Sequence, residues 1–247
     1  LILLTVSVLM TGCMPSSPSV QAEVAQADVP RETAPDVSEE QMAALVEGNT
    51  AFAADLYQEL RDTDGNLFFS PYSISTALAM TYAGARGETE TQMAETLHFT
   101  LPQDELHPAF NALDMALEPG ADATDEEFIL HIANSLWAEK EYDFREAFLD
   151  LLARHYGAGL RLVSFKTAPE DAREAINEWV SDQTEEKIQD LIPKGGITDL
   201  TRLVLANAIY FNAKWTHTFP KENTEDGAFT LVDGIEVEVP MMAWNKP

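Results

Sequence analysis

The stretch from Arg202 to Phe211, RLVLANAIYF, constrains the fold more than any other part of the chain. Its β-branched and aromatic residues predict a strand, and apolar residues occupy both its odd and its even positions. Because successive side chains of a strand point to opposite faces of a sheet, this pattern predicts a strand covered on both faces. We therefore expect a large sheet in which this strand is central.

A second constraining stretch begins at Ser70 and Pro71. Serine caps helices well, and proline fits the first helical turn, where its missing N–H costs nothing. Residues 74–83 are apolar or small on nearly every side, which predicts a helix in the interior of the protein. Just before it, NLFFS at 66–70 has the composition of a short buried strand.

Cap and turn signals place further elements along the chain. The pattern SEEQ at 38–41 is a capping box that predicts a helix start, and Thr89 with Gln92 forms a second one. Asp233-Gly234 separates two strand patterns and predicts a hairpin. Helical patterns gather early while strand patterns are scattered through the chain, so we expect the α+β class.

The first 37 residues have a different composition. Residues 1–13 predict a signal peptide, because the apolar run LILLTVSVLM is too short to span a bilayer. The run ends in LMTGC, which resembles a bacterial lipobox although Met10 departs from the usual pattern. We expect lipidation of Cys13 and export to the extracellular space or cell surface; an ordinary signal peptide with an incidental Cys13 is the alternative. Residues 14–37 predict a flexible tether.

The charge balance limits the possible partners. Fifteen basic and 42 acidic residues give a formal net charge of -27. Nucleic acids and anionic membrane surfaces would repel such a chain, so we expect neither as a partner, and membrane contact only through a lipid anchor.

An enzyme is a rival interpretation, because the chain contains many serines and five histidines. Yet the sequence has no Gly-x-Ser-x-Gly elbow, His-Glu-x-x-His or Cys-x-x-Cys motif, phosphate-binding loop or dinucleotide fingerprint. The Glu95-x-x-His98 pattern lacks the second copy that a di-iron site needs. We therefore expect no catalytic residue, metal site or cofactor. The histidines are His98, His107, His131, His155 and His217.

Four stretches in the same order resemble the serpins, a family of serine protease inhibitors. They are NLFFSPYSISTALAMTYAGARGETETQMAETLHF (66–99), AINEWVSDQTEEKIQDLI (175–192), LVLANAIYFNAKW (203–215) and VEVPMM (237–242). The resemblance runs from about Ser38 to Pro247 and implies a serpin domain over 38–247. That fold has a helical N-terminal half, a large central sheet A, and parts of sheets B and C.

The resemblance also assigns site residues. Ser70, Ser73 and Asn207 match the family's "shutter", the buried polar groups beneath the place where the central sheet opens, and Trp215 matches its "breach", where an incoming strand first enters. Buried serine and asparagine side chains need hydrogen bonds, so these residues should form a network. The alternative is that the serines only cap and pack, and that Trp215 is an ordinary buried aromatic.

In function, the resemblance implies inhibition of a serine-type or cysteine endopeptidase: the protease cleaves an exposed loop, which then inserts into the central sheet and traps the enzyme. In the family pattern the reactive loop lies beyond Pro247, so the reactive-site residue is unknown. We expect the N-terminal portion of a bacterial-type, lipid-anchored serpin that is monomeric at full length. This portion alone should be inactive.

Two further alternatives to this interpretation stay open. A non-inhibitory serpin that binds partners or acts as a chaperone-like surface protein would share every feature before Pro247. A surface-anchored binding lipoprotein unrelated to proteases is supported by the anchor alone. Heparin is not expected as a partner, because residues 104–118 contain no lysine or arginine.

Overall fold

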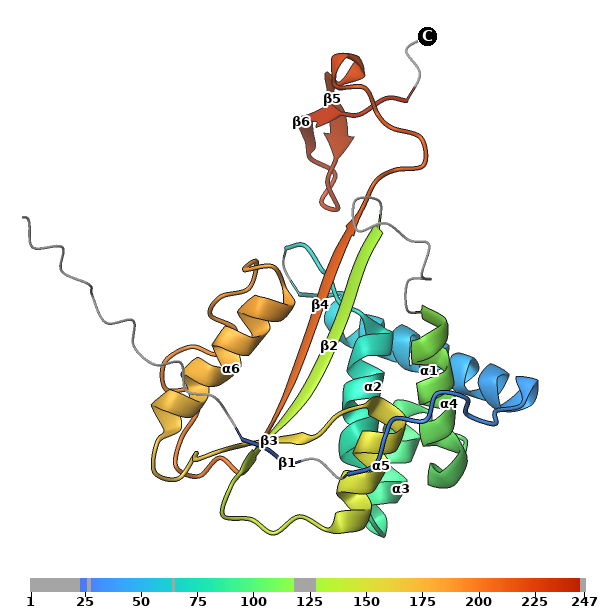
Figure 1. Ribbon diagram of the computed structural model, residues 1–247. Helices are drawn as coiled ribbons and strands as arrows, with labels where there is room; N and C mark the ends of the chain where they lie inside the picture. Colours follow the sequence, from blue (N-terminus) through green and yellow to red (C-terminus); the bar gives the residue numbers. More distant parts are fainter. Residues whose placement is uncertain (1–22, 26–27, 64, 118–127, 245–247) are drawn as a thin grey trace, which may run out of the picture.

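The computed structural model describes residues 23–25, 28–63, 65–117 and 128–244, and the signal peptide and Cys13 lie outside these ranges. Within them, helices and strands are mixed as the α+β prediction requires (Figure 1). The helices are α1 (Glu39–Leu60), α2 (Pro71–Tyr82), α3 (Glu88–Leu97), α4 (Gln103–Leu117), α5 (Glu146–Tyr156) and α6 (Pro169–Gln183), with a 3-10 turn at Lys221–Asn223. The strands are β1 (Glu23–Ala25), β2 (Phe128–Glu139), β3 (Leu160–Val163), β4 (Leu203–Ala213), β5 (Glu225–Thr230) and β6 (Glu236–Met241).

The main sheet has the strand order β1-β3-β2-β4. The long antiparallel pair β2–β4 runs in unbroken register from Phe128↔Ala213 to Ala138↔Leu203. Among the described residues, no strand pairs with the outer side of β4, so its central position in the sheet stays a prediction. Its apolar pattern reflects helices on both faces rather than strands on both edges.

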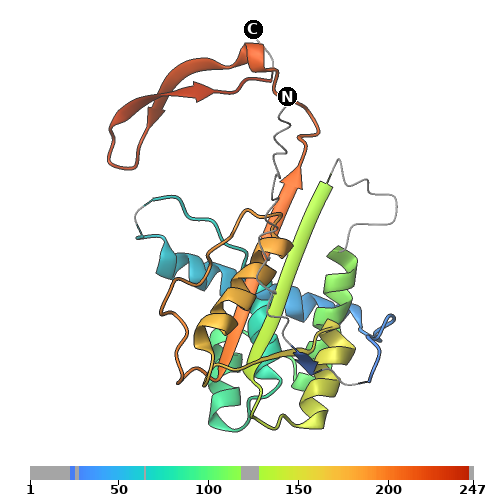
Figure 2. The same cartoon turned by 60° about the vertical axis from the view of Figure 1, so that its left-hand side comes forward.

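Helices cover the two faces of the β2–β4 pair. Leu136 and Ala138 cluster with Met80 of α2 and Leu152 of α5. On the opposite face, α6 lies across the sheet and buries Trp137 (Figure 2). In β4, Ala206 and Ala208 belong to the α6 cluster, and Leu205 packs against the cluster on the other face. The predicted burial on both faces is therefore confirmed for the middle of β4.

Of the two predicted capping boxes, one is present and the other is not. Ser38 caps α1, where it exchanges hydrogen bonds with Gln41 in a complete capping box, as predicted. The box at Thr89 is wrong, because α3 already begins at Glu88. Gly87 precedes it with φ at +64°, a conformation that glycine adopts readily, and the chain turns into the helix there.

The strand expected at 66–70 is also absent. These residues form no regular element, and the Phe68 side chain is 80 % exposed. A strand needs a neighbour to satisfy its backbone groups, and no described strand pairs with this segment. The composition of NLFFS shows that the segment is apolar, but it does not show whether another strand pairs with it.

The described part of the expected tether, 23–25 and 28–37, makes specific contacts with the rest of the domain. β1 pairs antiparallel with β3. Arg31 forms a 2.6 Å ion pair with Asp114 and donates a 2.8 Å hydrogen bond from Nε to Asn111 Oδ1. Asn111 in turn donates to the carbonyl oxygen of Glu32 at 2.7 Å. The tether prediction considered composition alone and missed this specific anchor.

The predicted hairpin at Asp233-Gly234 is confirmed. β5 and β6 pair antiparallel, and Gly234 has φ at +84°, which suits the turn. In Figure 1 this hairpin projects beyond the end of β4, away from the helices.

Candidate functional site

A polar cluster lies where α2 approaches the middle of the β2–β4 pair. Asn207 of β4 stands opposite Asn134 of β2, and its Nδ2 donates to Asn134 Oδ1 at 2.5 Å. The same amide also donates to the Ser73 hydroxyl of α2. Three elements that are distant in sequence therefore meet through the side-chain amide of Asn207.

Ser70 contacts Ser73, a member of this cluster, at the start of α2. As the N-cap of α2, its hydroxyl accepts a 3.3 Å hydrogen bond from the backbone N–H of Ser73. The Ser73 side chain is fully buried, so a partner for its hydroxyl is required on energetic grounds. Both roles weighed for these serines, capping and network formation, are present: Ser70 caps the helix, and Ser73 contacts Asn207.

This arrangement does not activate a nucleophile. An attacking serine needs a base within hydrogen-bond reach, and the described partner of the Ser73 hydroxyl is an amide donor. What the cluster can do is exchange hydrogen-bond partners: small polar side chains between two strands and a helix can re-pair when the strands separate, whereas an apolar contact would lose its packing.

Asn134 was not singled out from the sequence. The sequence contains a signal for it, because Asn134 is a polar residue within the apolar strand pattern FILHIANSLWAEK. Asn207 has the same setting within RLVLANAIYF. An amide in the middle of each of two apolar strands predicts that the amides pair.

Trp215 follows the end of β4 and is not brought to the polar cluster. Its side chain is 67 % exposed, so it is not an ordinary buried aromatic. The ring meets Phe219 edge-on, with centroids 5.5 Å apart. The assignment of Trp215 to the breach stays a prediction.

The described histidines serve other purposes. His98 pairs with Asp55 at 2.7 Å, and Nδ1 of His107 lies 2.7 Å from the Tyr156 hydroxyl. Burial lowers the pKa of His107 to about 3, so this imidazole is neutral at physiological pH. Among the described residues, no group of three or more His, Cys, Asp or Glu side chains could hold a metal ion, and no helix is long and apolar enough to cross a membrane.

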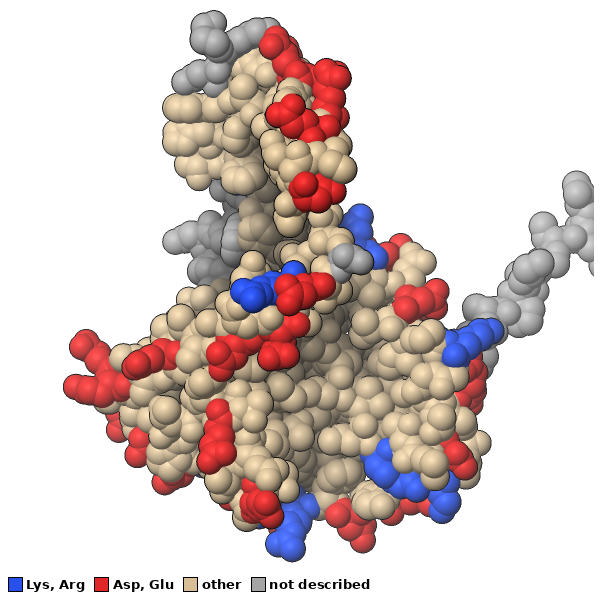
Figure 3. Space-filling model, turned by 180° about the vertical axis from the view of Figure 1, so that it is seen from behind, with Lys and Arg blue, Asp and Glu red and all other residues tan. Residues whose placement is uncertain are grey.

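The surface is strongly acidic. On the face seen from behind, Asp and Glu side chains outnumber Lys and Arg and extend onto the hairpin (Figure 3).

The fold, with its polar cluster beneath a long strand pair, is that of a serpin. The chain belongs to this family: the family model described as "Serpin (serine protease inhibitor)" matches residues 47–247. The chain is 45 % identical over 208 residues to the leukocyte elastase inhibitor of Equus caballus, covering 83 % of this chain and 53 % of that protein. The human leukocyte elastase inhibitor is 41 % identical over 207 residues, with the same two coverages.

Solved structures give the same result. The structure of ovalbumin from emu (Dromaius novaehollandiae) matches with a TM-score of 0.72 and 30 % identity, covering 81 % of this chain and 54 % of that one. The predicted serpin fold is therefore confirmed. The chain spans about half the length of the relatives it matches.

Proposed function

We propose that the whole protein inhibits a serine-type endopeptidase by trapping it, with the cleaved reactive loop inserting into the main sheet. The observation that supports this most is the Ser73–Asn134–Asn207 cluster beneath β4. A sheet that gains a strand needs contacts that can rearrange, and hydrogen-bonded polar side chains between α2, β2 and β4 can exchange partners. The names of the relatives, leukocyte elastase inhibitors, support an elastase-type target.

The energy scale is adequate for trapping. Insertion of a cleaved loop as a new strand, with release of stored strain, is the mechanism of inhibitory serpins as a family. An inserted strand of about ten residues contributes on the order of 10 kcal/mol, at about 1 kcal/mol net per hydrogen bond. Domain stabilities are typically about 5–15 kcal/mol, so the uncleaved state must be held kinetically.

The test is complex formation between the whole protein and pancreatic elastase. We expect a covalent band on denaturing gels and time-dependent loss of elastase activity, with papain as the cysteine-protease comparison. The 247-residue polypeptide is the matched control and should leave elastase active. Cleavage of the whole protein without a covalent complex would contradict the proposal and favour the non-inhibitory alternative.

We further propose that the protein is exported and anchored through a lipid on Cys13, supported by the sequence LMTGC. In a bacterial host, we expect a clickable fatty acid to label the protein and the Cys13→Ala variant to lose the label and leave the membrane fraction. Ser16→Ala is the control and should keep both. Equal labelling of the Cys13→Ala variant, or no labelling of either, would contradict this anchor.

A further inference from the structure

Strand β2 has an open edge along its first half. Residues 136–139 pair with β3 on one side, while the pairing with β4 on the other side extends over 128–138. Over 128–135, therefore, no described strand lies beside β2 on the side away from β4. This edge is distinct from the outer edge of β4 and lies on the other side of the strand pair.

Hydrogen bonds at the end of β2 establish which backbone groups face this edge. The N–H of Glu139 donates toward β4, to Arg202 O at 3.1 Å. The N–H of Lys140 donates toward β3, to Val163 O at 3.0 Å. Pairing direction alternates along an antiparallel strand, and the register with β4 is unbroken. Even-numbered residues of β2 therefore point their N–H and C=O groups away from β4.

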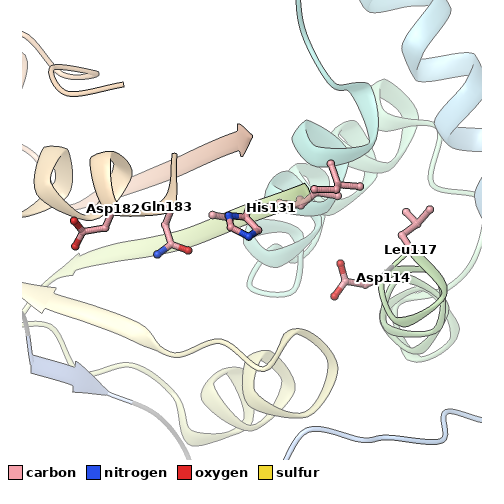
Figure 4. A pocket seen from close by; sticks show the side chains of 8 residues that line it. Asp114, Leu117, His131, Asp182 and Gln183 are labelled. Carbon is pink, nitrogen blue, oxygen red and sulfur yellow. The ribbon is translucent and has the colours of Figure 1, made fainter. Parts of the chain in front are cut away.

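Leu130 and Ile132 have this parity, and a cavity of about 340 Å³ lies beside them. It is formed between α4 and α6, on either side of the strand (Figure 4). The backbone groups of these two residues thus face a space that another chain can enter. The lining residues are Asp114 and Leu117 of α4, Leu130, His131, Ile132 and Ala133 of β2, and Asp182 and Gln183 of α6.

The charges of the lining favour a cationic occupant. Asp114 and Asp182 stand on opposite sides of His131 in Figure 4, and no lysine or arginine lines the cavity. Asp182 is exposed at the end of α6, while Asp114 already holds Arg31 through Oδ2 at 2.6 Å. Because Arg31 already neutralises Asp114, Asp182 is the carboxylate that would select a cation.

We propose that this edge binds an extended, lysine- or arginine-bearing segment of a partner protein, which adds to β2 as a short strand. Main-chain hydrogen bonds to Leu130 and Ile132 would supply affinity, and the acidic lining would select basic side chains. Alternate side chains of an added strand point to the same face, so basic residues at every second position could face Asp182 while the residues between them face α4. The sequence EPGADATDEE at 118–127 has acidic and no basic residues, so its charge disfavours it as the occupant. This site is independent of protease trapping.

The experiment titrates the 247-residue chain with three capped hexapeptides and follows binding by calorimetry. We expect acetyl-(Lys-Val)₃-amide to bind, the glutamate analogue not to bind, and a lysine peptide with alternate backbone N-methyl groups to bind at least about tenfold more weakly, because it cannot complete the strand hydrogen bonds. Hydrogen exchange should slow at 130–132 in the presence of the first peptide.

Asp182→Asn should weaken binding of the lysine peptide about two- to fivefold, the range for one exposed charge pair. Glu178→Gln is the matched control, since Glu178 is exposed one turn earlier on α6 and lies outside the cavity; it should leave binding unchanged. Equal binding of the acidic and basic peptides, no effect of N-methylation, equal effects of the two substitutions, or no binding at all would each overturn the proposal.

Discussion

The described part of the chain has a covered part within the β2–β4 strand pair and a projecting part at and beyond the end of β4, and their apolar side chains differ sharply in exposure. In the covered part, residues 133–138 of β2 and 205–208 of β4, Trp137 is 2 % exposed and Ala206 is 1 % exposed. In the projecting part, residues 209–244, Phe211 is 58 % exposed and Trp215 is 67 % exposed. The apolar pattern of the sequence continues through both parts, while the helices cover only one.

The difference teaches that apolar composition and burial are separate properties. In the hairpin, Phe229 and Ile235 are 50 % and 57 % exposed although they lie in or beside strands. Apolar side chains gathered in this way mark surfaces that other protein atoms cover. Within the described residues, stability should therefore come from the covered part. Three matched pairs of substitutions test this.

Two tryptophans give the largest expected contrast. Trp137→Ala should lower the free energy of unfolding by about 3–5 kcal/mol, because it removes a buried aromatic from between the sheet and α6. It also removes one of the two rings, at 5.4 Å each, that flank the Arg161 guanidinium; the other belongs to Trp179. Trp215→Ala should change the same quantity by less than about 0.5 kcal/mol.

The measurement is urea unfolding followed by circular dichroism, since fluorescence would change with the tryptophan itself. A loss for Trp215→Ala comparable to that for Trp137→Ala would show that the projecting part is packed in solution. The covered and projecting parts would then not differ in what their tryptophans contribute to stability.

Much of the fold could be predicted from local chemistry. The capping box at Ser38 and the Asp233-Gly234 turn need only neighbouring residues, and both are confirmed. The two-faced pattern of 202–211 identified a covered strand but not its position in the sheet, because burial on the faces does not depend on what lies at the edges.

The features that were not predicted depend on contacts between residues distant in the sequence. NLFFS forms no strand because strand formation requires a neighbour, which composition cannot supply. The docking of residues 28–37 depends on Arg31 meeting Asp114, 83 positions away. The polar cluster was partly foreseen: Ser73 and Asn207 were expected to lie in one network by family resemblance, and Asn134 was missed although it has the same local signal.

Two asparagines on β4 give an intermediate contrast. Asn207→Ala should lower the free energy of unfolding by about 1–3 kcal/mol, because the buried Ser73 hydroxyl and the half-buried Asn134 amide would lose their partner. Asn212→Ala, in the projecting part, removes an exposed 3.3 Å contact with Tyr210 and should cost less than about 0.5 kcal/mol. Equal effects in urea unfolding would argue that the polar cluster contributes no more than a surface contact.

Two histidines give the smallest contrast, visible only as a dependence on pH. Burial lowers the pKa of His107 to about 3, with smaller contributions from His155 and Arg86, while the unfolded chain should titrate near 6.5. The folded state therefore binds fewer protons between these values. The stabilisation is complete above about pH 6.5 and is lost as pH falls toward 3.

For one such group the loss between pH 6.5 and 5.5 is about 1 kcal/mol. His107→Gln should remove that loss, since glutamine does not titrate and can still reach the Tyr156 hydroxyl that lies 2.7 Å from the imidazole. His217→Gln, in the exposed part beyond β4, is the control and should leave the slope of the wild-type protein unchanged. Burial also lowers the pKa of His155, which is present in both variants and should leave a residual slope of the same sign. Identical slopes for His107→Gln and the wild type would mean that water reaches His107 in solution. The packing of α4 against α5 would then not shield this side chain.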